Sequence, residues 1–450
     1  MNMIKRFAIS ATLLFLVIQS FAQGRMLTLD SCFVLARNNN AQYLYSQYEI
    51  ERAREVKAQV FTKFFPQVSL GYSAYYAMRP LVEYSVDDLN NKGDFGEFVA
   101  AVIQLLNDPE IGGDVPTKVD ALKKGHGVNA MAVVPLFAGG RIVNGNRLAK
   151  LGVEAAELKS EVTERDVLEE VEASYFLVLG LQEKEATVTA ALTLIDSLDH
   201  VVDKALAAGL ITRSDKLLVA LKRNELKAKE MQLENGILLA SHLLCHQIGI
   251  PYPEGGLVLE NNLFDVGKYA PAEEGSFLRP EKRLLELQVQ AESLYKKMTV
   301  GEALPQLGVG ALATYGNIMD RAKFNVLLFA RLSVPLTQWW ETSHKMKEHE
   351  WKIREAELQQ KELAEKMQLQ EMQAYNQMVE AESLLRSDSA ALDMAEENYR
   401  LAELNYKAGM NTITDVLEAN ALLLQARNAI TDRQITYATA CRKYHDLTGR

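Results

Sequence analysis

Four segments of this chain alternate between apolar and polar positions. The first begins after Pro66 and ends at Tyr76, with apolar side chains at every second position and small or polar ones between them. The other three cover 128–136, 307–315 and 324–336. Alternation of this kind predicts strands that have one apolar and one small or polar face. The runs are 9 to 13 residues long, about the length of a tilted strand that crosses an outer membrane.

Long helical patterns follow the second and the fourth strand. They cover 141–206 and 341–406, and a continuous helix of this length would extend on the order of 100 Å. Glycine-containing turns then reverse the chain, and return helices are expected over 215–247 and 415–447. A further helix is expected over 29–62, before a Phe-Phe-Pro sequence. Globular domains do not need such long helices, so the pattern indicates an extended helical structure.

The last return helix carries a heptad repeat of apolar residues. Its members are Val416, Leu423, Ile430, Tyr437 and Tyr444. With small residues three positions later, they predict a coiled-coil seam that allows close approach of the helices. The first return helix has a weaker series, Leu217, Met231, Leu238 and Cys245, with Asn224 in the seam.

The same elements occur twice along the chain. An offset of 200 positions separates Gly209 from Gly409 and recurs at Pro135 and Gly249. One offset at several landmarks indicates two copies of one unit. The first copy contains an extra segment, 78–127, which we expect to be a long hairpin loop on the outer side of a membrane. The expected domains are a signal peptide at 1–22, a first repeat at 23–250, a linker at 251–278 and a second repeat at 279–450.

The first 22 residues have the features of a signal peptide. Lys5 and Arg6 precede a short apolar stretch, and Ser20-Phe21-Ala22 forms a small-residue cleavage site. Cys32 lies well past this site, so we do not expect an acylated first residue. No run of about 20 apolar residues follows, and a membrane-spanning helix is therefore not expected.

Charge and cysteine content exclude several classes of protein. The net charge is −10 and there is no basic patch, which argues against binding of nucleic acid. The three cysteines show no disulfide framework. His242, Cys245 and His246 have a spacing that could bind zinc, but a fourth ligand is not evident, so no metal is predicted. No catalytic arrangement is evident, and we expect neither an enzyme nor a cofactor.

Four strands cannot close a membrane barrel, because the smallest such barrels have about eight strands. An open sheet edge cannot lie in lipid. Strands from several chains must therefore combine, and three copies would give 12 strands. The fold class that we expect is an α+β membrane protein, in which a trimeric 12-stranded β-barrel continues into a long antiparallel coiled-coil helical barrel.

Aromatic residues stand where strands meet helices. They are Phe64, Phe65, Phe137, Trp339 and Trp340. If the four junctions lie on one side of the membrane, these rings would form an interfacial girdle. The alternative is that they are ordinary core aromatics.

At this point the chain resembles the TolC family of outer-membrane efflux channels. The similar motifs are Leu27–Asp30, Ala36–Asn39, Phe65-Pro66, Pro135–Arg141 and the two turns in which a Gly precedes an Asp. The resemblance implies a homotrimer in the lipid of the outer membrane with a periplasmic helical tunnel. It also implies partnership with a periplasmic membrane-fusion adaptor and an inner-membrane pump, either proton-driven or ATP-driven.

The resemblance places the two turns at the periplasmic tip, where the adaptor docks. By position it implicates Ala208, Gly209, Leu210, Thr212, Ala408, Gly409, Met410 and Thr412. Glycine ends a helix readily and allows a partner close approach. The alternative is that Thr212 and Thr412 only cap the return helices, with Asp215 and Asp415 completing capping boxes. Both interpretations can hold together.

The resemblance also makes the tip a gate. Asp215 matches a position that bonds a tyrosine of the neighbouring helix pair, here Tyr406. Asp415 and Glu418 match an acidic constriction, which would attract cations. Asn411 departs from the family pattern, because a basic residue is expected there. The alternative is that both carboxylates are a solvated helix start favoured by the helix dipole.

The function that we expect is a passive outer-membrane exit duct, which conducts small amphipathic compounds from an inner-membrane pump. A duct for type I protein secretion has the same sequence features and remains an alternative. A periplasmic coiled-coil scaffold is an alternative of a different class, against which the alternating strands argue.

Overall fold

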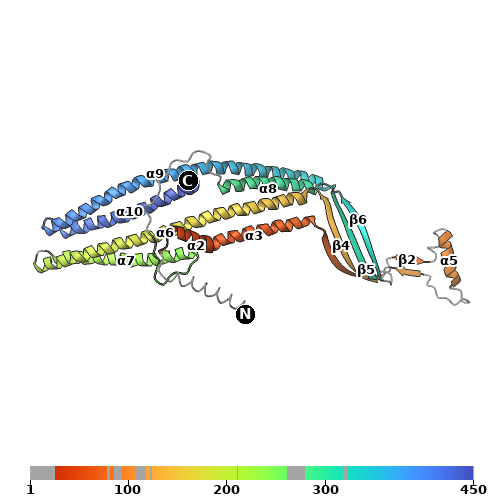
Figure 1. Ribbon diagram of the computed structural model, residues 1–450, viewed down its shortest axis with the longest axis horizontal. Helices are drawn as coiled ribbons and strands as arrows, with labels where there is room; N and C mark the ends of the chain where they lie inside the picture. The colour runs from red at the N-terminus through yellow and green to blue at the C-terminus, as the bar shows by residue number, and fades with distance from the viewer. Residues whose placement is uncertain are drawn as a thin grey trace, which may run out of the picture. The chain divides into compact units, whose positions relative to one another are not determined.

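The computed structural model describes residues 26–78, 82–85, 94–106, 118–121, 124–209, 211–260, 279–317 and 322–448 (Figure 1). The expected signal peptide and most of the expected linker lie outside these residues. The helices are α2 (Leu29–Asn39), α3 (Ala41–Phe61), a short 3-10 helix η1 (Thr62–Phe64), α5 (Asp94–Leu106), α6 (Arg141–Ala207), α7 (Arg213–Ile248), α8 (Pro280–Glu302), α9 (Gln338–Lys407) and α10 (Ile413–Thr448). The strands are β1 (Gln67–Tyr76), β2 (Val82–Ser85), β3 (Lys118–Ala121), β4 (Lys124–Ala138), β5 (Gln306–Asn317) and β6 (Ala322–Ser333).

The chain forms two compact units. The first comprises Met1–Ala53, Val153–Val289 and Glu355–Arg450, and the second comprises Arg54–Gly152 and Gln290–Arg354. The long helices α6 and α9 contribute residues to both units, whereas the four long strands belong to the second unit and both helical turns to the first.

The second unit contains an antiparallel sheet with the strand order β1-β4-β5-β6. All four expected strands are present. The expected end of the last strand at 336 is wrong, since β6 ends at Ser333. Ser333 lies opposite Gln306, the first residue of β5, so residues 334–336 have no residue of β5 opposite them. Within the described residues, β1 and β6 are the two edges of this sheet.

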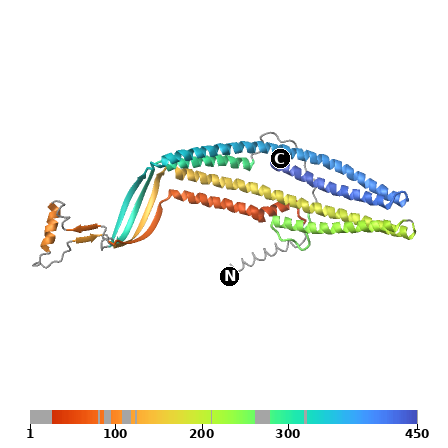
Figure 2. The same cartoon turned by 180° about the vertical axis from the view of Figure 1, so that it is seen from behind.

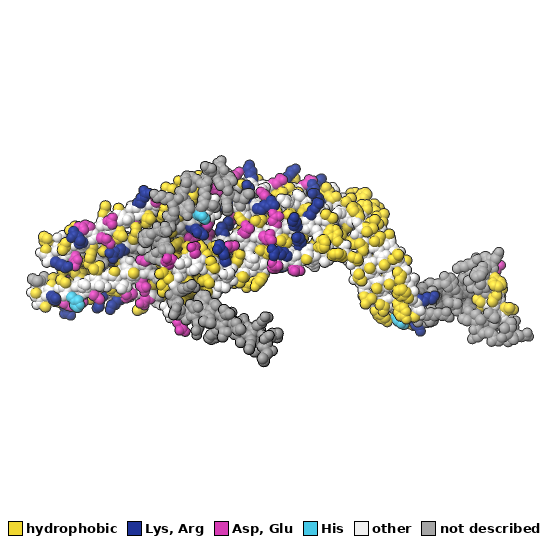
Figure 3. All heavy atoms as spheres, in the orientation of Figure 1, with side chains coloured by type: hydrophobic (Ala, Val, Ile, Leu, Met, Phe, Trp, Pro, Cys, Tyr) yellow, Lys and Arg dark blue, Asp and Glu magenta, His cyan; other side chains and the backbone are white. Residues whose placement is uncertain are grey.

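The register of the sheet sorts its residues onto two faces. Val68 lies opposite Ala132, and the row continues through Ala311 to Leu328. Directly opposed residues point to the same side of a sheet, and every row of this side is apolar except at the end near Lys124. We call it the apolar face; its members are Val68, Leu70, Tyr72, Val128, Ala130, Ala132, Ala311, Ala313, Tyr315, Phe324, Val326 and Leu328. Figure 3 shows hydrophobic side chains covering the visible side of this sheet.

The opposite side, the mixed face, combines polar and small residues with a few apolar ones. Its rows include Gln67–Val133–Gly310–Phe329, Gly71–Asn129–Thr314–Asn325 and Ser73–Gly127–Gly316–Lys323. Ring atoms of Phe329 occupy the space where a Cβ on Gly310 would lie, and Tyr75 covers Gly125 in the same way. The predicted difference between the two faces is therefore present, although the second face is less polar than expected.

The turn from β4 into α6 packs against the last turn of α8. Gly139 has φ 63°, a left-handed conformation that favours glycine. A Cβ on Gly139 would meet the backbone of Gly301, and a Cβ on Gly301 would meet the backbone of Gly139, both well inside 3.0 Å. Two main chains touch here, and only the absence of both side chains permits it.

The sequence predicted that the extra segment 78–127 is a long loop, but the described part of this segment contains strands and a helix. Strands β2 and β3 pair in a short antiparallel two-stranded sheet, from Val82 opposite Ala121 to Ser85 opposite Lys118. The apolar stretch near residue 100 is helix α5. Strands of four residues are too short for a periodic signal, and a short apolar run does not distinguish a helix from a strand.

In the first unit, the single helix expected over 29–62 is divided. Asn40 has φ −64° and ψ 125°, outside the helical region. Its side-chain oxygen accepts hydrogen bonds from the N–H groups of Gln42 (2.9 Å) and Tyr43 (3.1 Å). Asn40 thus ends α2 and caps α3, because an Asn side chain can replace the missing partners at a helix start.

The return helices bury their heptad residues unequally. In α10, Val416 (0% exposed) and Tyr444 (1%) lie in buried clusters. In α7, Leu217 and Met231 remain 61% and 64% exposed, although Cys245 at the end of the series is buried. The chain itself thus buries the seam residues of α10, whereas it leaves most of the seam residues of α7 exposed. Among the described helices, none is both long enough and apolar enough to span a membrane.

Candidate functional site

The turn between α9 and α10 ends one helix with glycine and starts the next with threonine. Gly409 has φ 75°. Its N–H group donates to the carbonyl of Tyr406 (3.0 Å), and that of Met410 donates to the carbonyl of Asn405 (2.8 Å). These bonds satisfy the last carbonyl groups of α9, as in the usual glycine-terminated helix end. Gly209, with φ 66°, ends α6 in a similar way.

Capping boxes begin both return helices. The N–H group of Thr412 donates to Asp415 Oδ2 (2.7 Å), and the N–H group of Asp415 donates to Thr412 Oγ1 (3.3 Å). Thr212 and Asp215 form the same pair of bonds, at 2.8 and 3.3 Å. The capping interpretation of both motifs is therefore confirmed as geometry. It leaves the docking role as a prediction.

Hydrogen bonds from the caps lower the pKa of both aspartates. The backbone N–H group of Thr212 is the main cause at Asp215, followed by the Thr212 hydroxyl, and Thr412 acts identically on Asp415. Both carboxylates are therefore held in the ionised form. A ring of carboxylates from several copies would act in the opposite direction.

The residues predicted to dock an adaptor lie on the surface of the first unit. Ala208, Gly209, Ala408, Gly409 and Thr412 are exposed, and Met410 is 71% exposed. No atom lies within 4 Å of the position where a Cβ would stand on either glycine. Leu210 lies outside the described residues. The glycines thus leave open space beside the backbone.

The two turns meet around one buried cluster. Ile413 and Val416 at the start of α10 pack with Val202 of α6 and Val219 of α7, and Ile211 and Tyr406 pack against them. Both views of the chain show the two turns at the same end of their helix pairs (Figures 1 and 2). Burial raises the pKa of Tyr406, and the charge of Asp215 raises it further. The predicted gate partners Asp215 and Tyr406 are therefore electrostatic neighbours.

The two predicted gate carboxylates face away from this cluster. Asp415 and Glu418 are exposed, whereas Val416 and Leu417 on the other side of α10 are buried. The N–H group of Asn411 donates to the carbonyl of Asn405 (3.3 Å), so Asn411 belongs to the glycine turn. The structure brings all the predicted gate residues to one end of the first unit.

None of the five predicted girdle aromatics belongs to the buried core. Phe64, Phe65, Phe137, Trp339 and Trp340 are 41%, 52%, 48%, 53% and 78% exposed. The indole N–H group of Trp339 donates to the carbonyl of Ala303 (2.9 Å), which fixes the start of α9. Exposure in a single chain disfavours the core interpretation, and a membrane interface stays a prediction.

The histidines and cysteine near the end of α7 do not converge on one point. His242 stacks on Tyr252 with ring centroids 4.1 Å apart, while Cys245 is buried in the core, where desolvation raises its pKa. No group of three or more His, Cys, Asp or Glu side chains within the described ranges is placed to hold a metal ion.

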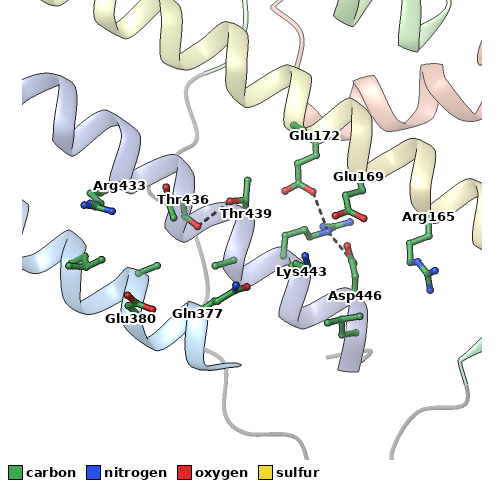
Figure 4. Close-up of a pocket in the computed structure, with 16 residues that line it drawn as sticks. Arg165, Glu169, Glu172, Gln377, Glu380, Arg433, Thr436, Thr439, Lys443 and Asp446 are labelled. Atoms are coloured by element: carbon green, nitrogen blue, oxygen red, sulfur yellow. Dashed lines mark hydrogen bonds and ion pairs between the residues drawn. The ribbon is translucent and has the colours of Figure 1, made fainter. Parts of the chain in front are cut away.

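A cavity of about 550 Å³ in the first unit was not predicted. It lies between α6, α9 and α10 (Figure 4). Glu172 of α6 is only 6% exposed at its edge, 4.0 Å from Arg442 Nε, and Arg442 also lies 3.3 Å from Asp446. Burial raises the pKa of Glu172 to about 7 despite the opposing charge of Arg442. The one available signal was a glutamate within the apolar stretch of α6 that begins at Val171.

The chain resembles known outer-membrane channels in sequence and in fold. Residues 283–450 match the family model for outer membrane efflux protein. The CmeC outer membrane channel of Campylobacter jejuni has a similar structure, with a TM-score of 0.75 and 14% identity over 94% of this chain and 85% of that one. VceC of Vibrio cholerae has a TM-score of 0.70 and 15% identity, over 94% and 96% of the two chains. The open state of the MtrE outer membrane channel of Neisseria gonorrhoeae has a TM-score of 0.74 and 14% identity, over 94% and 88%. No curated protein sequence matches.

These matches identify the architecture. The fold is that of outer-membrane efflux channels, mostly helical with a four-stranded antiparallel sheet among the described residues. The resemblance to the TolC family that the motifs indicated is confirmed. The proteins that the chain resembles are channels, not enzymes.

Proposed function

We propose that three copies of this chain form a passive exit duct in the outer membrane. Small amphipathic compounds would pass through it from a periplasmic adaptor and an inner-membrane pump to the outside. In this proposal residues 1–22 direct export, residues 23–250 and 279–450 are two repeats, and 251–278 links them.

The sheet is the observation that carries the proposal. Its apolar face continues through all four strands, from Val68 on β1 to Leu328 on β6. These two side chains are 74% and 78% exposed. Exposure of large apolar side chains to water is unfavourable, whereas the same side chains are stable in contact with lipid.

The edges of the sheet require further copies of the chain. In lipid, the unpaired N–H and C=O groups of β1 and β6 have no water to bond. If β6 of one copy pairs with β1 of the next, three copies close a barrel of 12 strands. The resemblance to the TolC family implies the same trimer.

The helical turns are the proposed docking site for the adaptor. Gly209 and Gly409 leave exposed backbone with free space beside it. The hairpin of a helical partner could approach this backbone closely. Asp215, Tyr406, Asn411, Asp415 and Glu418 lie at the same end and would form the gate.

A complementation experiment tests the function. Deletion of the gene should increase sensitivity to dyes, bile salts and metal ions, and the wild-type chain should restore resistance. A chain with Gly209→Trp and Gly409→Trp should assemble and reach the membrane but fail to restore resistance, because indole rings would fill the docking surface.

The matched control is Gly209→Asn with Gly409→Asn. Asparagine tolerates the left-handed conformation, so it preserves both turns while adding a small side chain. It should restore resistance. Full resistance with the Trp variant would refute docking at the turns. Normal resistance to all compounds after deletion, combined with loss of a secreted protein, would instead establish the protein-secretion duct. A detergent-independent soluble monomer would establish the scaffold.

A further inference from the structure

The charged residues of the long strands are all basic. Within β1, β4, β5 and β6 there is no Asp or Glu, and the charged residues are Lys124, Lys323 and Arg331. An ordinary protein surface would carry both acidic and basic residues, so the absence of acidic residues from these strands is unusual. Their effect depends on which face of the sheet carries them.

The register places two of them on the mixed face. Lys323 lies opposite Gly316, which lies opposite Gly127 and then Ser73. Arg331 lies opposite Gly308, eight residues further along the same strand. The even spacing puts both cations on one side of β6. Lys124, which lies opposite Tyr76, is instead at the end of the apolar face.

The neighbours of these cations leave them uncovered. The row of Lys323 contains two glycines and a serine, and Gly308 beside Arg331 has no side chain. Both residues are exposed. Because none of these four strands carries a carboxylate, no residue on the described part of the sheet can neutralise them. Because their neighbours are small, both cations are accessible to solvent and solutes that contact the mixed face.

Closure of the sheet would turn each cation into a ring. In the proposed trimer, three copies of Lys323 and three of Arg331 would line the lumen. The two rings would stand about 27 Å apart along the strand, at about 3.4 Å per residue. This distance exceeds the Debye length of about 8 Å at physiological ionic strength, so each ring would act separately. Charged rings within a low-dielectric wall raise the local concentration of counter-ions and set selectivity.

We propose that Lys323 and Arg331 make the strand section of the duct selective for anions. Its favoured cargo would be amphiphiles that carry a carboxylate, sulfate or similar anionic group. This inference rests on the proposed function, since it needs the mixed face to line a lumen. The carboxylates Asp415 and Glu418 have the opposite sign and lie in the other unit, so the two sections would prefer opposite charges.

Bilayer recordings in a potassium chloride gradient test the proposal. The protein would carry Asp415→Asn and Glu418→Gln, so that the tip does not set the reversal potential. On this background the channel should be anion-selective. Adding Lys323→Gln and Arg331→Gln should shift the reversal potential toward the cation value, and each single substitution should give part of that shift.

The control is Lys124→Gln, which removes one positive charge from the apolar face. It should leave the reversal potential unchanged. The proposal is overturned if the double substitution has no effect on a conducting channel, or if Lys124→Gln shifts the potential equally. Absence of any conductance from the assembled wild-type protein would overturn the proposed duct itself, and the two failures are thus distinct.

Discussion

Glu172 shows how one residue can make stability depend on pH. Its pKa is about 4.5 in an unfolded chain and about 7 in the fold, where burial disfavours the charge. Between these values the folded state binds more protons than the unfolded state, so stability falls as pH rises through this window.

We expect Glu172→Gln to remove this pH dependence. At pH 8 the variant should be more stable by on the order of 2–3 kcal/mol, and at pH 4 it should equal the wild type. Thermal unfolding of the detergent-solubilised protein at both pH values measures the effect. Glu170→Gln, two residues away on α6 and exposed, is the control, because its charge is not among the causes of the Glu172 shift. Equal melting shifts at pH 4 and pH 8 would contradict the argument.

Asp415 and Glu418 should differ although both are predicted gate residues. Asp415 is bonded to its cap Thr412, whereas Glu418 is one turn further into the helix. Replacing Asp415 by Ala should lower both the melting temperature and cation selectivity. Glu418→Gln should lower only the selectivity and the block by divalent cations, as single-channel recordings would show. Unchanged selectivity in both variants would leave capping as the only role.

At the scale of elements, the contact between the β4–α6 turn and α8 depends on two glycines. We expect Gly301→Ala to destabilise the protein by about 1–3 kcal/mol, because the new Cβ would meet backbone that cannot yield like a side chain. Thermal unfolding and the yield of assembled protein measure this.

Gly152 in α6 provides the matched control. No atom lies within 4 Å of the place of its Cβ. Gly152→Ala should be stabilising by about 0.5–1 kcal/mol, since alanine favours a helix interior. If Gly301→Ala does not change the stability of the protein, the turn can move away from α8 to make room for the new side chain.

The sequence predicted the elements well where periodicity was long. The four strands and the long helices 141–206 and 341–406 are close to the observed β1, β4, β5, β6, α6 and α9. The sequence did not predict the break between α2 and α3 at Asn40, because a single residue that ends one helix and caps the next leaves the helical pattern on both sides intact. It also failed in the extra segment, where the strands are only four residues long.

At the scale of the molecule, the exposed α7 seam predicts association. Leu217, Leu221, Met231 and Leu238 are 61%, 57%, 64% and 47% exposed in a single chain. Their spacings of 4, 10 and 7 residues place them on one side of α7, in a stripe of the kind that packs against another helix. The described part of one chain covers the corresponding seam of α10 but leaves this stripe open.

We expect Met231→Asp to weaken the proposed trimer, because a buried carboxylate at a helical interface is costly. Mass measurement of the protein in detergent should show smaller species. Lys229→Asp changes the charge on the opposite side of α7 and should leave the trimer intact. A stable Met231→Asp trimer would exclude this seam from the interface.

The sequence by itself determined the periods of the strands and helices, the two glycine turns and the family that the motifs resemble. Those features depend on local conformation, which neighbouring residues set. The tertiary structure decided what depends on distant contacts. The register of four strands placed Lys323 and Arg331 on one face, the packing of α6 against α10 buried Glu172, and the meeting of two main chains required Gly139 and Gly301. No local pattern encodes these, because each is fixed by a partner more than a hundred residues away or by a neighbouring strand.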